Sequence, residues 1–81
     1  MRLEIITPDK NVFEGEVESA KFPGSAGSFQ VLKDHAPLIS SLEKGTVSYR
    51  TANGEHYVFI DGGVVEVLNN RIIVLAESAT V

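Results

Sequence analysis

The stretch Val47–Ile60, VSYRTANGEHYVFI, indicates the fold class of this chain more strongly than any other segment. β-Branched and aromatic residues fill its two arms, Val47–Arg50 and His56–Ile60, as is typical of strands. Between the arms stands Asn53-Gly54, which favours a type I′ hairpin turn because both residues tolerate a positive φ. The stretch therefore predicts two antiparallel strands joined by a short turn.

Short apolar runs separated by turn residues continue on both sides of this hairpin, and helical periodicity is nearly absent. Asn69-Asn70 predicts a second hairpin, and Lys44-Gly45 and Asp61-Gly62-Gly63 predict breaks between strands. We expect the end of the chain to fray beyond Ser78. The first arm of the hairpin belongs to a predicted strand over residues 46–51. The other predicted strands cover residues 3–6, 13–19, 29–32, 38–42, 64–68 and 72–75.

The segment Phe13–Ser19 alternates, with Glu14, Glu16 and Glu18 on one side. Three like charges on one strand face are tolerable only in water, so this side is predicted to be solvated. The alternation changes parity before Phe22, which predicts a β-bulge near Ser19. The whole chain, residues 1–81, is predicted to be one all-β domain, a compact β-sandwich of about eight to ten short strands with a meander in its second half.

Composition excludes several classes of protein. The 81 residues carry a net charge of −4 with scattered basic residues, which argues against a nucleic-acid surface. The absence of cysteine excludes disulfides and cysteine-based metal sites. The N-terminus lacks the features of a signal or import sequence, and no apolar run approaches the roughly 20 residues that span a bilayer. We therefore expect any membrane association to go through a partner, without direct insertion.

Enzymatic motifs are also missing. His35 and His56 are isolated and fit no metal-ligand spacing, and no serine lies in a G-x-S-x-G elbow. Gly24–Gly27 could be a phosphate loop only with a helix N-terminus or a Lys-Ser/Thr pair after it, and neither follows. We predict no catalytic, cofactor-binding or metal-binding residues.

The run Phe22–Phe29 and the segment His35–Leu38 concentrate glycine, proline and aromatic residues. A proline-stiffened extended segment loses little entropy on binding, so both pieces suit a protein–protein contact. The competing interpretation is that these residues only shape the loop and pack in the core. Phe29 in particular is either tucked inward or presented to a partner.

Several motifs in order resemble the N-terminal β-sandwich domain of the epsilon subunit of F-type ATP synthases. The resemblance covers essentially the whole chain. It rests on Thr7-Pro8-Asp9 with Val12–Gly15, on Gly24-Ser25-Ala26-Gly27, on His35-Ala36-Pro37-Leu38, on Asp61–Val67 and on Ile73–Ala79.

The resemblance implies a non-catalytic rotor subunit that clasps the gamma subunit, rests on the c-ring and couples proton flow to ATP synthesis. It implies a place on the cytoplasmic face of the bacterial plasma membrane. Many relatives have an acidic residue where this chain has Ser28, which weakens the case for a polar ring contact. By position, the c-ring-facing loop would be Ser25, Ala26, Gly27, Ser28 and Phe29, and the gamma-facing residues Thr7, Pro8, His35, Ala36, Pro37 and Leu38.

Most members of that family continue into two helices that can inhibit ATP hydrolysis and in some bacteria bind ATP. This sequence stops at Val81, so we expect a short form without the helical domain, without inhibition through helical extension and without bound ATP. The alternative function is a free-standing β-sandwich that binds a small ligand or peptide at the Phe22–Leu38 surface.

Overall fold

The computed structural model describes all residues from Met1 to Val81 and contains strands but no helix. The all-β prediction is confirmed, with eight strands in one continuous hydrogen-bonded sheet. The strands are β1 (Arg2–Ile6), β2 (Asn11–Glu16), β3 (Ser19–Gly24), β4 (Gly27–Val31), β5 (Leu38–Thr51), β6 (Gly54–Leu68), β7 (Arg71–Ala76) and β8 (Ala79–Thr80).

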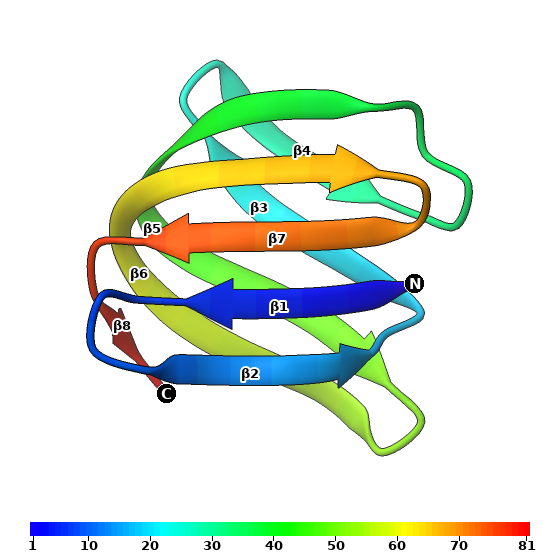
Figure 1. The fold of residues 1–81 in the computed structure, drawn as a ribbon, viewed down its shortest axis with the longest axis horizontal. Helices are drawn as coiled ribbons and strands as arrows, with labels where there is room; N and C mark the ends of the chain where they lie inside the picture. Colours follow the sequence, from blue (N-terminus) through cyan, green and yellow to red (C-terminus); the bar gives the residue numbers. More distant parts are fainter.

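The sheet folds over itself into two layers because β5 and β6 are long and bend through both (Figure 1). The front layer of Figure 1 has the order β2-β1-β7, followed by residues 63–68 of β6 and 38–42 of β5. The rear layer contains β4, β3, the other halves of β5 and β6, and β8. The predicted sandwich is therefore built from a single sheet, and β5-β6-β7 form the expected antiparallel meander.

The predicted breaks at Lys44-Gly45 and Asp61-Gly62-Gly63 are wrong, because pairing runs through both. Leu42 pairs with Gly63 and Lys44 with Asp61. Gly62 and Gly63 have φ of 103° and 150°, which lets β6 bend without ending. These residues mark the corner at which the paired strands pass from one layer to the other.

Both predicted hairpins are present, but the turn of the first hairpin, between β5 and β6, differs from the prediction. Thr51 pairs with Gly54, so the two turn residues are Ala52 and Asn53. Neither turn residue has a positive φ; Gly54, the residue that follows them, has a φ of 116°. The Thr51 hydroxyl accepts a hydrogen bond from the Asn53 amide at 3.1 Å, which holds this turn. The positive φ at both turn residues that was predicted there occurs instead in the second hairpin.

In that second hairpin, Asn69 and Asn70 have φ of 50° and 61°. The Asn70 side chain forms two hydrogen bonds with Asp34. Its amide nitrogen donates to the Asp34 carboxylate at 2.9 Å, and its amide oxygen accepts from the Asp34 backbone N–H at 2.6 Å. The β6–β7 turn is thereby tied to the loop before β5.

Two other local predictions need correction. The strand predicted over Phe13–Ser19 ends at Glu16, and no bulge is needed because Val17 and Glu18 connect β2 to β3. The predicted fraying beyond Ser78 is wrong, because β8 pairs with Phe59 and Ile60 of β6. The solvated row of Glu14, Glu16 and Glu18 is confirmed, since all three are exposed.

Alternate residues of both layers point between them and form one core. Burying each large aliphatic side chain stabilises the fold by about 1.5–3 kcal/mol before the entropy of ordering is counted. With no cysteine present, this packing carries the fold. The fully buried large side chains are Leu3, Ile5, Phe22, Val31, Val47, Val58, Ile60, Val65, Val67, Ile72 and Val74.

Candidate interaction surface

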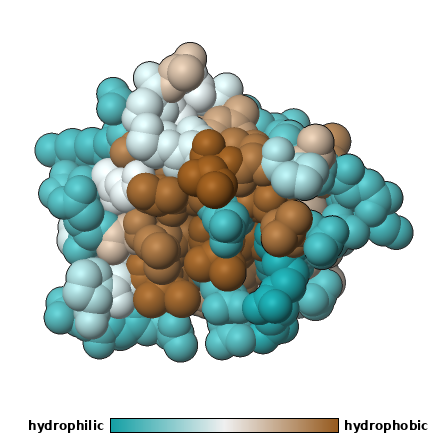
Figure 2. All heavy atoms as spheres, turned by 45° about the horizontal axis from the view of Figure 1, so that its top comes forward, coloured by the Kyte–Doolittle hydropathy of each residue, from teal (hydrophilic) through white to brown (hydrophobic).

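The outer face of the front layer is unusually apolar for a surface in contact with water. Ile39 is 72% exposed and Leu75 is 55% exposed. Turning the top of Figure 1 forward shows hydrophobic atoms gathered over one face with hydrophilic atoms around them (Figure 2). We call this surface the apolar face; its side chains are Ile6, Ile39, Val64, Leu68, Ile73 and Leu75.

Strand register explains why residues so far apart in the sequence form one surface. Val64 lies opposite Leu75, which lies opposite Ile6 on the neighbouring strand. One row along, Glu66 lies between Ile39 and Ile73. Residues facing the same side of adjacent strands are in lateral contact distance, so the rows merge into one patch. Patches of this kind on a small protein mark interaction surfaces.

Two open hollows lie at opposite ends of the apolar face. Register fixes the ends, since Leu38 is aligned with Val67 and Ile72, whereas Ile6 is aligned with Leu75 and Val64. The first hollow is lined by Pro37, Leu38, Ile39, Glu66, Val67 and Leu68. The second is lined by Ile6, Thr7, Pro8, Leu75, Ala76 and Glu77.

The residues predicted to face gamma are therefore divided between the two ends. Thr7 and Pro8 line one hollow, while Pro37 and Leu38 line the other. The His35 amide donates to the Leu32 carbonyl at 3.1 Å, and its Nδ1 lies 2.8 Å from the Ala36 carbonyl oxygen. Four of the predicted residues thus lie at the ends of the apolar face, His35 and Ala36 line neither hollow, and the face itself was not predicted from the sequence.

The predicted ring-facing loop is only partly a loop. Ser25 and Ala26 form the turn, whereas Gly27, Ser28 and Phe29 belong to strand β4. The Ser41 hydroxyl donates to the Ser25 hydroxyl at 2.8 Å, and the Ser25 amide donates to the Ser41 carbonyl at 3.0 Å. These bonds fix the hairpin tip against β5.

Phe29 is tucked inward. Its ring packs on the ring of Phe22 with centroids 5.5 Å apart, and it is partly buried against the core. Within Ser25–Phe29, the exposed side chains are therefore Ser25, Ala26 and Ser28. Gly27 is also exposed and adds backbone surface there.

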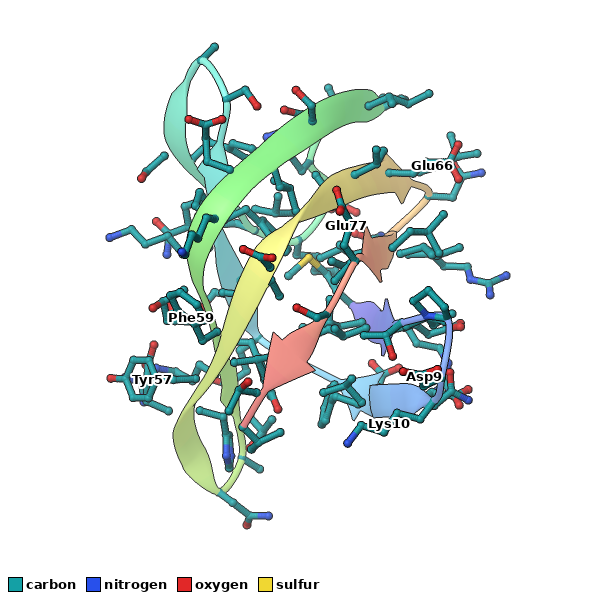
Figure 3. The ribbon with its side chains drawn as sticks, turned by 90° about the vertical axis from the view of Figure 1, so that its left-hand side faces the viewer. Asp9, Lys10, Tyr57, Phe59, Glu66 and Glu77 are labelled. Atoms are coloured by element: carbon teal, nitrogen blue, oxygen red, sulfur yellow. The ribbon has the colours of Figure 1, made fainter.

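The outer face of the rear layer is different in character. It carries exposed Tyr57 and Phe59, seen on the side away from Glu66 in Figure 3. Beside them is a polar groove in which Arg50 and Glu55 form an ion pair at 2.9 Å. The other residues lining this groove are Ser19, Ala20, Lys21, Gln30, Ser48 and Tyr57.

The geometry shows no cluster of side chains suited to a metal ion. There is no group of three His, Asp or Glu side chains that could hold a metal ion. The pKa of Arg2 is raised, chiefly by its hydrogen bond to Glu14, and burial raises the pKa of Tyr49. Both shifts have structural causes and involve neither hollow.

The fold and its surfaces thus define a small β-sandwich whose most distinctive feature is an apolar sheet face suited to another protein. Comparison of sequences then gives the family. A family model described as the β-sandwich domain of the ATP synthase delta/epsilon chain matches residues 1–81, and the chain belongs to this family.

Curated relatives agree with the assignment. An ATP synthase epsilon chain of Nitratidesulfovibrio vulgaris is 44% identical over 98% of this chain. Another, of Maridesulfovibrio salexigens, is 42% identical over 95% of it. The chain spans 59% and 54% of the lengths of these two relatives, respectively.

Solved structures share the fold. A chain in the mitochondrial ATP synthase of Euglena gracilis, in a structure of its OSCP, F1 and c-ring, matches with a TM-score of 0.89. That match is at 20% identity and covers 96% of this chain and 51% of the other. A chain of the Tetrahymena thermophila central stalk and c-ring matches with a TM-score of 0.81 at 17% identity, covering 98% and 64%. The present structure contains no helix with the length and hydropathy needed to cross a membrane.

Proposed function

We propose that this chain acts as a non-catalytic part of the central stalk of an F-type, proton-translocating ATP synthase. In this role it links the gamma subunit to the c-ring and couples proton flow to ATP synthesis. The observation that carries the proposal is the match of the family over residues 1–81, together with relatives named ATP synthase epsilon chain at 42–44% identity. Because those relatives are longer, the role of the whole subunit is inferred.

The apolar face is proposed as the surface that binds gamma. Covering Ile39, Leu75 and their neighbours removes apolar area from water, which favours association. Thr7-Pro8 and Pro37-Leu38 line the hollows at the two ends of this face and would extend the same contact, and His35-Ala36 directly precede Pro37. A rotor subunit has to stay bound while it transmits torque, and a broad apolar contact suits that requirement.

The hairpin Ser25–Phe29 is proposed as the part that faces the c-ring. Its turn is fixed to β5 by the two Ser25–Ser41 hydrogen bonds, so it presents a defined shape. Since Phe29 is occupied in packing on Phe22, the contact would rest on Ser25, Ala26, Gly27 and Ser28. We place the assembled protein at the cytoplasmic face of the bacterial plasma membrane, held there through its partners.

Copurification of the tagged chain with gamma from the same organism tests the proposed function. The wild type should retain gamma, and Leu75→Glu, which puts a charge on the apolar face, should lose it. Thr46→Glu is the matched control, because Thr46 is an exposed strand position on the rear layer. Failure of the wild type to retain gamma would overturn the proposal.

The ring contact has a separate test. Because the chain contains no cysteine, Ser28→Cys gives a single thiol that can be cross-linked to the c-ring in the assembled complex. Cross-linking is expected from position 28 and absent from Thr46→Cys. Equal yields from both positions would contradict the assignment of the hairpin.

A further inference from the structure

Glu66 is the one charged side chain enclosed by the apolar face. Across the strands it lies between Ile39 and Ile73, and along β6 its same-side neighbours are Val64 and Leu68. The carboxylate forms no ion pair or side-chain hydrogen bond within the chain. Figure 3 shows it projecting from β6 on the side opposite Tyr57 and Phe59.

The other acidic residues of the front layer are placed differently. Glu4 accepts a hydrogen bond from Arg71 at 3.3 Å, Glu14 is paired with Arg2, and Glu16 lies 3.5 Å from the amino group of Met1. Both arginines therefore serve carboxylates on β1 and β2. Glu66 has apolar residues directly opposite it and along its own strand. Its diagonal neighbour Arg71, opposite Leu68, is already paired with Glu4, so Glu66 has no ion pair within the chain. Glu77 is also unpaired, but it lies at the end of the apolar face in the second hollow.

Covering the apolar face would remove water from this carboxylate. An ionised group that loses water without gaining a partner makes binding strongly unfavourable, whereas a well-placed cation offsets much of that loss. A partner that is apolar throughout is thus a poor fit to this surface. A partner with a matching apolar surface and one basic side chain near its centre is a good fit.

We propose that Glu66 determines the specificity of the apolar face by pairing with a lysine or arginine of the gamma subunit. The inference rests on the proposed function and goes beyond it by naming the residue and the chemistry of its partner. Because the pair lies inside the contact, it acts on the lifetime of the complex more than on the rate of encounter. A charge at the rim of the contact would instead act mainly on the rate of encounter.

The experiment compares wild type, Glu66→Gln and Glu18→Gln in surface kinetics with purified gamma. Glu18 is the matched control, because it is exposed, has no ion pair and lies in the β2–β3 connection outside the apolar face. Both variants change net charge equally and retain side-chain size. Glu66→Gln should weaken binding by at least about tenfold through faster dissociation, and Glu18→Gln should leave both rates near wild type.

The basic partner is identified by replacing each lysine and arginine of gamma with methionine or glutamine. One of these replacements should weaken wild-type binding and have little further effect on Glu66→Gln, as a double-mutant cycle requires of paired residues. Absence of coupling at every basic position would overturn the inference.

The outcomes separate the two proposals. If wild type fails to bind gamma, the proposed function falls and this inference falls with it. If wild type binds and Glu66→Gln binds as well or better, only the inference falls. In that case Glu66 would instead keep the free apolar face from self-associating, which sedimentation of Glu66→Gln alone would reveal.

Discussion

The ring of Phe29 packs on the ring of Phe22 across the β3–β4 hairpin, with centroids 5.5 Å apart and planes tilted by 35°. Gly24 makes room for this pair, because a Cβ there would lie 2.9 Å from the Phe29 ring. The contact joins edge strand β4 to the core. It follows that Phe29 stabilises the domain, with most of its ring contact made to the core rather than offered to a partner.

Replacing Phe29 with alanine should accordingly lower the free energy of unfolding. Loss of a partly buried aromatic ring and its partner contact is expected to cost about 2 kcal/mol. Urea denaturation followed by tyrosine fluorescence or circular dichroism measures the change. Ser28→Ala, one residue away on the exposed side of β4, is the control and should be nearly neutral. An unchanged midpoint for Phe29→Ala would mean that the ring is not part of the core.

Gly63 at the corner of β6 offers a sharper test of the fold. A Cβ at this position would overlap the Leu75 carbonyl oxygen, and the φ of 150° is itself unfavourable for other residues. Gly63→Ala should therefore destabilise the protein by about 3 kcal/mol or more, or prevent its folding.

Gly27→Ala is the matched control for this change. Gly27 has a φ of 131°, but a Cβ there would meet nothing within 4 Å. It should lose only the backbone contribution, about 1–3 kcal/mol, without the steric overlap that Gly63→Ala adds. Equal losses at the two glycines, measured by chemical denaturation, would contradict the steric account of the corner.

Local patterns predicted the strands better than they predicted how the strands connect. The runs 64–68 and 72–75 and the turn at Asn69-Asn70 follow from local chemistry and are present in the structure. Asp61-Gly62-Gly63 contains the same residues as a turn, yet hydrogen bonding to β5 carries β6 through it. A glycine pair shows that the backbone must deviate, but tertiary pairing decides whether it bends or ends.

The candidate surface was predicted only at its ends. Thr7-Pro8 and His35–Leu38 attract notice because proline and histidine are conspicuous in a sequence. The apolar face is spread over β1, β5, β6 and β7, and only register unites it. The available signal was that 72–75 is apolar on both strand faces, which indicates a strand covered on both sides.

Tyr49 gives a prediction about stability at high pH. Its ring lies 4.4 Å from the ring of Phe13 and 5.3 Å from that of His56, measured between centroids. Burial raises the pKa of its phenol above the ordinary value of 10.0. The folded state therefore keeps this proton to higher pH than the unfolded state does, and stability should fall as pH rises above about 10.

Tyr49→Phe retains the ring contacts but removes the ionisable group. The variant should match wild type within about 0.5 kcal/mol at pH 7 and lose less stability than wild type above pH 10. Denaturation midpoints collected across that range provide the measurement. Parallel pH curves for the two proteins would show that Tyr49 does not contribute to the alkaline loss.

His35 separates a binding role from a structural one. Its contacts are local, to the backbone of Leu32 and Ala36, so His35→Ala should change the free energy of unfolding by less than about 1 kcal/mol. Because His35 lies two residues before Pro37, which lines a hollow of the apolar face, the substitution should nevertheless weaken association with gamma several-fold in a pull-down or kinetic assay. His56→Ala is the matched control, because His56 lies in the rear-layer hairpin beside Thr51 and should leave gamma binding intact. Similar affinity for both variants would remove His35 from the interface, while a large loss of stability in the free domain would assign it to the fold.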